Sequence, residues 1–127
     1  MVFGVIGLFG LPAGKWGVVM TRVKSSILVS AALRQASMNF IDCVLARRGD
    51  ADAGAIFVHI DALDGRHKLL ARSLDFDGNY AWQIITSTEW VDGETAASRL
   101  AAETKMDHDA FVVAVTDAKA RNPFDEL

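Results

Sequence analysis

The chain has 127 residues, of which 51% are hydrophobic and 23% are charged, and its formal net charge is −3. This length corresponds to one domain, and a chain of this size buries roughly two thirds of its unfolded surface on folding. The apolar content argues against a disordered protein. The small negative charge excludes a global attraction to nucleic acid or to an anionic membrane, although a local basic patch is compatible with it.

Residues 1–20 differ in composition from the rest of the chain. They hold five of the ten glycines, and no charged residue precedes Lys15. The apolar run is broken by Pro12 and is too short to span a bilayer, and it lacks the basic start of a secretory signal. The segment 10–16 has neither the glycine spacing nor the Ser or Thr of a phosphate-binding loop. We expect an apolar, glycine-rich extension outside the folded domain, with a natural start at Met20.

Two helices are predicted from apolar periodicity. Apolar residues recur at three- and four-residue spacing from Val29 to Phe40 and predict a helix over 24–40. A second helix is expected over 93–106, with Asp92 as its N-cap. Its inner stripe is expected to comprise Ala97, Leu100, Ala101 and Thr104.

Short apolar or alternating runs predict five strands. The expected strands are 41–47, 55–61, the residues after Gly65, 80–86 and 111–116. The last of these is continuously apolar, which favours a position inside the sheet.

The dipeptide at 64–65 (Asp-Gly) is typical of a two-residue hairpin turn, because a type I′ turn needs positive φ at both central positions. Such a turn pairs Asp61 with Lys68. In this register Lys68 lies on the outer face of the hairpin, and His59 and His67 point to opposite faces.

The element order is therefore α-β-β-β-β-α-β, which indicates an α+β fold. Consecutive hairpins favour a mostly antiparallel sheet with the two helices on one face. We expect residues 21–117 to form a single α+β domain. Residues 118–127 are polar and contain Pro123, so we expect them to form an irregular C-terminal tail.

Three sequence blocks are typical of one bacterial family. They are Arg22-x-Lys24-Ser25, then Arg47-Arg48-Gly49-Asp50-x-x-Ala53-Gly54, and then Asp107-His108-Asp109-Ala110-Phe111-Val112-Val113-x-Val115-x-Asp117. Through these blocks, residues 21–117 resemble the family called domain of unknown function 1491, small proteins found mainly in alphaproteobacteria. Where the family pattern has Asp-Pro-Asp-Leu-Trp, this chain has His108 in place of proline, which makes the turn less rigid. The resemblance implies an intracellular bacterial protein of one domain and no assigned activity.

The sequence contains no spacing typical of a catalytic or metal site. There are three histidines, without a His-Glu-x-x-His motif, and the single Cys43 cannot belong to a paired metal motif. Cys43 lies in an apolar stretch, so we expect it to pack in the core. The segment 50–54 lacks the third oxygen ligand of a calcium loop. We therefore expect no catalytic residue, no cofactor and no metal.

The outer face of the predicted hairpin is the candidate binding surface, because it combines basic and aromatic side chains. It comprises Arg47, Arg48, Phe57, His59, Lys68, Leu70 and Arg72. Such a surface suits a protein partner or a second copy of the chain, it suits the phosphates and bases of RNA, and it is also compatible with an ordinary solvated face. We expect a cytoplasmic, non-catalytic protein-binding domain, an adaptor or a self-associating homodimer, that does not bind membranes. The alternatives are a nucleic-acid-binding module that uses this basic face and an enzyme acting on a small molecule.

Overall fold

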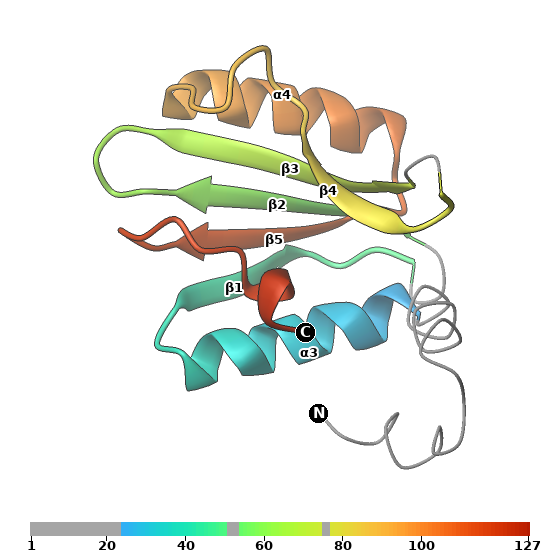
Figure 1. Cartoon of the computed structure of the whole chain (residues 1–127). Helices are drawn as coiled ribbons and strands as arrows, with labels where there is room; N and C mark the ends of the chain where they lie inside the picture. Colours follow the sequence, from blue (N-terminus) through green and yellow to red (C-terminus); the bar gives the residue numbers. More distant parts are fainter. Residues whose placement is uncertain (1–23, 51–53, 75–76) are drawn as a thin grey trace, which may run out of the picture.

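The protein is a twisted sheet with one helix on each side (Figure 1), seen in a computed structural model that describes residues 24–50, 54–74 and 77–127. The predicted extension at residues 1–20 lies outside the described residues. The strand order in the sheet is β1-β5-β2-β3-β4. The elements are α3 (Ser25–Met38), β1 (Asp42–Arg47), β2 (Ile56–Asp61), β3 (His67–Leu74), β4 (Tyr80–Ile84), α4 (Gly93–Met106), β5 (Phe111–Thr116) and the 3₁₀ turn η1 (Pro123–Glu126).

The predicted α+β class and element order are confirmed. Three strand pairs are antiparallel, and β2 pairs with β5 in parallel. The parallel pair arises because α4 carries the chain from the edge strand β4 back to β5, which lies between β1 and β2. No described helix is long and apolar enough to cross a membrane.

The two helices pack against opposite faces of the sheet, and not together on one face as expected. Successive residues of a strand point to opposite faces. On one face Ala32 of α3 belongs to the same apolar cluster as Val58, whereas on the other face Leu100 of α4 packs against Phe57. The sequence signal for this arrangement is the continuous apolar run in β5, because strands buried on both faces lose their alternation. Within α4, Ala96 is the buried residue, and Ala97 and Ala101 of the expected stripe are exposed.

The turn between β2 and β3 is one residue longer than expected. The N–H of Ala62 donates to the carbonyl oxygen of Arg66 at 3.0 Å. Positive φ angles occur at Leu63 (65°) and Gly65 (87°), so the loop encloses three residues. The Asp61 carboxylate accepts the N–H of Leu63 at 2.8 Å and stabilises this shape. A side-chain acceptor therefore overrides the two-residue turn that the Asp-Gly pair alone predicts.

The longer turn changes the face on which every side chain of β3 lies. Asp61 pairs with His67, and Ile60 pairs with Lys68, so the predicted pairing of Asp61 with Lys68 is wrong. A shift of one residue moves a whole strand's side chains to the other face. Lys68 therefore lies on the α3 face of the sheet, and His67 lies on the α4 face with His59.

The C-terminal residues are part of the packed domain and not an irregular tail. The turn η1 packs against α3, and Phe124 is 7% exposed within the main core cluster. The ring of Trp82 lies against Phe124, with 4.7 Å between the ring centroids. The side chain of Asn122 accepts the N–H of Phe124 at 3.0 Å and begins the turn. An element of four residues has no periodicity to detect, so sequence pattern alone could not find it.

The three family blocks meet at one end of the sheet. Ser25 is buried and donates from its hydroxyl to the carbonyl oxygen of Gly54 at 2.7 Å. A Cβ added at Gly49 or at Gly54 would clash with the backbone carbonyl of Asp109. Arg47 donates from Nη1 to the carbonyl oxygen of Asp107 at 3.2 Å. The contacts between these blocks therefore hold the start of β5 close to the segment that follows β1.

We predict that Gly54→Ala lowers the free energy of unfolding by about 3 kcal/mol, because the neighbouring backbone cannot move aside for a methyl group. Gly65→Ala is the matched control, since its site has open space and only a positive φ of 87°. The control should lose about 1 kcal/mol. Urea unfolding of both variants tests this prediction, and equal losses would contradict it.

Candidate binding site

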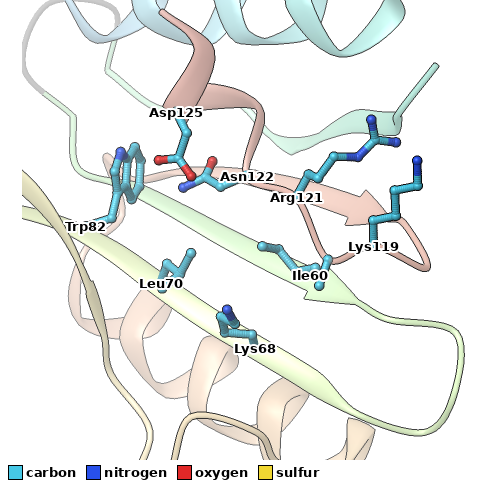
Figure 2. A pocket seen from close by; sticks show the side chains of 9 residues that line it. Ile60, Lys68, Leu70, Trp82, Lys119, Arg121, Asn122 and Asp125 are labelled. Atoms are coloured by element: carbon cyan, nitrogen blue, oxygen red, sulfur yellow. The ribbon is translucent and has the colours of Figure 1, made fainter. Parts of the chain in front are cut away.

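An open cavity of about 400 Å³ lies on the α3 face, where no described helix covers the sheet (Figure 2). On this face α3 packs over β1 and against η1, and none of the described helices covers the half of the sheet formed by β3 and β4. The lining residues come from three adjacent strands and from the C-terminal segment. They are Ile60, Lys68, Leu70, Trp82, Lys119, Ala120, Arg121, Asn122 and Asp125.

The floor of the cavity is apolar. Ile60 of β2 is fully buried, and Leu70 of β3 is 8% exposed. Trp82 of β4 completes the floor and is held in place by its contact with Phe124. These side chains share one face because the pairs Ile60–Lys68, Val58–Leu70 and Arg72–Trp82 place alternate residues of the three strands side by side.

The wall of the cavity is fixed by an ion pair. Asp117 accepts from Nε of Arg121 at 2.8 Å and from its Nη2 at 3.0 Å, and it also accepts the backbone N–H of Arg121 at 2.9 Å. Arg121 additionally donates to the carbonyl oxygen of Asn39 at the end of α3. Between the partners Ala120 has a φ of 53°, a left-handed conformation that L-residues avoid. The ion pair holds this turn in shape despite the strained residue.

Charges of both signs surround the apolar floor. Nζ of Lys68 is 3.1 Å from a carboxylate oxygen of Glu89 and 4.6 Å from the centre of the Trp90 ring. In Figure 2 the side chain of Asp125 lies beside Trp82, across the floor from Lys68. The site therefore combines an aromatic and aliphatic floor with a mixed polar rim.

The structure separates the seven residues of the predicted surface. Lys68 and Leu70 line the cavity, and Arg72 lies nearby on the same face, 3.7 Å from the centre of the Tyr80 ring. Phe57 and His59 lie on the opposite face, where Phe57 is covered in the cluster that includes Leu100. The cause is the longer hairpin turn, which puts β2 and β3 in a different register.

The two predicted arginines near the end of β1 lie apart from the cavity. Arg47 donates to backbone carbonyl oxygens of Thr104 and Asp107 at the end of α4, and Arg48 is exposed. The floor residue Trp82 and the wall residues 119–125 were absent from the predicted surface. In β4 the large apolar residues alternate with smaller or polar ones, and this pattern could have placed Trp82 on one face of the sheet. The wall residues are brought to the site by the tertiary packing of the C-terminal turn, which has no sequence pattern.

A histidine pair occupies the α4 face. Nε2 of His59 is 3.0 Å from Nδ1 of His67, although the predicted register put the rings on opposite faces. Burial lowers the pKa of His59, the positive charge of His67 lowers it further, and Asp61 acts in the opposite direction. Nε2 of His67 is 3.9 Å from the Asp61 carboxylate. Within the described ranges, no three His, Cys, Asp or Glu side chains are placed to hold a metal ion.

Cys43 packs at the margin of the main core cluster, in strand β1. Burial and the neighbouring Asp42 raise the pKa of its thiol to about 11. The thiol is therefore protonated at neutral pH, and only a thiolate is a strong nucleophile or metal ligand.

The fold and the site define a class of small α+β domain. In the described residues its sheet lies between two helices, and a cavity beside the C-terminal turn lies on the part of one face that no described helix covers. The chain belongs to the family described as Protein of unknown function (DUF1491), which it matches over residues 23–125. This match confirms the resemblance in the three sequence blocks. It also includes the segment that forms the cavity wall.

Solved structures of similar proteins support the same assignment. The chain is 25% identical to a DUF1491 family protein from Caulobacter crescentus CB15, whose crystal structure gives a TM-score of 0.73 over 80% of this chain and 94% of that chain. The NMR structure of a protein with the same description gives a TM-score of 0.71, again at 25% identity, over 80% and 92% of the two chains. The solution structure of protein Atu0922 from A. tumefaciens is 27% identical, with a TM-score of 0.64 over 75% and 86%. No curated protein matches the chain.

We predict that Asp117→Asn lowers the free energy of unfolding by about 1 to 2 kcal/mol, after allowing for the partial exposure of Arg121. The hydrogen bonds from Arg121 lower the pKa of Asp117 to about 2, so its stabilising contribution is complete above the ordinary pKa of 3.8 and is lost as the pH falls toward 2. The variant should therefore show a weaker acid dependence of unfolding than the unmodified protein. Asp64→Asn, at an exposed ion pair with Arg66, is the control and should change stability little.

We predict that the protein loses stability as the pH falls below the ordinary histidine pKa of 6.5, in part because His59 must be protonated against its lowered pKa. The stabilising contribution of His59 is present above 6.5 and lost as the pH falls through the lower, folded-state value. His59→Gln should reduce the difference in urea midpoint between about pH 7.5 and about pH 5.5. His108→Gln, at an exposed site, should leave that difference unchanged. An unaltered difference in the His59 variant would contradict the proposed contribution of His59.

Proposed function

We propose that the protein is a small non-catalytic adaptor domain that binds a segment of another protein in the cavity between the sheet and the C-terminal turn. The observation that carries this proposal is an open space of about 400 Å³ over an apolar floor, on the part of the sheet that no described helix covers. Self-association of the chain through the same open half of the sheet is the second form of binding that we propose.

The chemistry of the cavity suits an anchor side chain of a protein partner. Binding sites on proteins combine aromatic and aliphatic contact with a charged rim, and a few anchor residues supply most of the binding energy. Trp82 and Leu70 offer the apolar contact, and Lys68, Lys119 and Asp125 offer rim charges of both signs. The volume lies in the lower part of the roughly 300–1,000 Å³ range of ligand sites.

The charged groups of the site favour binding over catalysis. Catalytic sites bring together titratable groups with shifted pKa values that face a common space. Here Asp117 has a lowered pKa, but its carboxylate is directed to Arg121, and Lys68 is paired with Glu89. These pairs stabilise the wall and rim of the cavity. We also infer a cytoplasmic location, since a single cysteine fits a reducing compartment.

We predict that the tagged full chain captures a protein from its host lysate and that Trp82→Ala lowers the recovery at least tenfold, because the variant removes the anchor contact of the floor. Lys119→Glu reverses an exposed rim charge and should lower recovery several-fold. Leu63→Ala is the matched control, because Leu63 is exposed at the hairpin tip, away from the cavity. The readout is quantitative mass spectrometry of nuclease-treated lysate, after circular dichroism has verified that each variant is folded.

The possible outcomes of the capture experiment distinguish between the candidate functions. A partner that survives nuclease and is lost with the cavity variants supports the protein-binding function. Capture that disappears with nuclease would replace it with the nucleic-acid alternative, for which affinity falls steeply with salt. Capture that persists unchanged in the Trp82 and Lys119 variants would contradict the cavity as the binding site. Thermal stabilisation by a metabolite without protein capture would favour the enzyme alternative.

A further inference from the structure

Within the part of the chain that the structure describes, the strand β4 is an edge of the sheet with no strand on its outer side. It is last in the strand order and pairs with β3 alone among the described strands. Its sequence, Tyr-Ala-Trp-Gln-Ile, contains no charge and no proline. Exposed edges of this kind pair with other strands unless charges, proline or bulges block them.

The opposite edge of the sheet carries such blocking features. Strand β1 begins at Asp42 and ends at Arg47, and its register with β5 is irregular between Leu45 and Arg47. Helix α3 also packs beside β1. The contrast between the two edges indicates β4 as the strand that is free to pair.

The backbone of β4 is arranged to pair with an identical strand. The N–H of Ile85 donates to the carbonyl oxygen of Leu69, so the hydrogen-bonding groups of alternate residues face β3. By this alternation, the N–H and C=O groups of Tyr80, Trp82 and Ile84 point to the open edge. The middle one of these three residues is Trp82. An antiparallel pair centred on Trp82 therefore matches each outward N–H of one copy with an outward carbonyl oxygen of the other.

The side chains are self-complementary in the same register. Tyr80 meets Ile84 of the second copy, and the two Trp82 residues are opposite one another on the cavity face. Tyr80 is 42% exposed and Ile84 is 40% exposed, so both have apolar surface to bury. Aromatic and aliphatic cross-strand pairs stabilise sheets, and an uncharged strand meets no like charge in its own copy.

We propose that two copies of the chain associate through antiparallel pairing of β4 with β4, with the two-fold axis at Trp82. This inference rests on the self-association in the proposed function and assigns it a strand and a register. Two five-stranded sheets become one continuous sheet across the axis. Five residues from each copy form a small interface, so we expect a dissociation constant on the order of 100 µM.

Sedimentation equilibrium of the purified full chain, from about 5 µM to about 1 mM, tests the dimer across this affinity range. Ile84→Lys places a charge at the paired edge and should weaken the dimer at least tenfold. Ile84→Pro removes an N–H that points away from β3 and should have the same effect without the loss of a bond to β3. Val44→Lys is the matched control, because Val44 is an exposed aliphatic residue on the other edge strand, 56% exposed.

A dimer that is weakened by both Ile84 variants and unchanged by Val44→Lys supports the proposal. If circular dichroism shows that Ile84→Pro does not fold, the result for Ile84→Lys alone decides whether the dimer forms through β4. A protein that stays monomeric to 1 mM overturns the proposal, and so does a dimer that the Ile84 variants leave intact. Ile84 does not line the cavity, so failure of this inference leaves the capture experiment and its result unaffected.

Discussion

Strand β5 sets the arrangement of the other elements. It pairs with β1 on one side and with β2 on the other, and Phe111, Val112 and Val113 are buried in succession on both faces of the sheet. A strand inside a sheet that is apolar on both faces needs cover on both faces. Helix α3 supplies it on one side, and α4, which must return the chain from the edge to the centre, supplies it on the other. The family blocks at residues 47–54 and 107–117 keep this strand in place, through close backbone contacts at Gly49 and Gly54.

The two described helices do not cover both faces of the five-stranded sheet completely. Helix α3 follows β1, so the β3–β4 half of its face is left to the short C-terminal segment. That segment forms the short turn η1 and places one aromatic side chain, Phe124, against Trp82. The space between this turn and the strands is the cavity. The Asp117–Arg121 pair helps to shape the cavity, because it ties together the chain that leads from β5 to η1.

The elements with a clear period were predictable, and the details that depend on single contacts were not. Helix 93–106 and strand 111–116 have the predicted limits, because Asp92 caps the helix and a continuous apolar run forms the strand. The hairpin register was wrong by one residue, because the Asp61 side chain selects a three-residue loop. That shift moved Lys68 to the α3 face and brought His59 and His67 together. Of the seven residues predicted for the binding surface, only Lys68 and Leu70 line the cavity. The wall at residues 119–125 could not be predicted from the sequence, because it is formed by tertiary packing.

Trp82 connects the two proposed interactions, because its side chain lies in the cavity floor and its backbone faces the open edge. A partner in the cavity and a second copy at the edge both restrict the same residue. Linkage is reciprocal: where pairing at β4 changes the affinity of the cavity for a partner, that partner changes the affinity of the pairing by the same factor. Trp82 is the residue at which the two proposed interactions would be coupled, because its side chain and its backbone serve one interaction each.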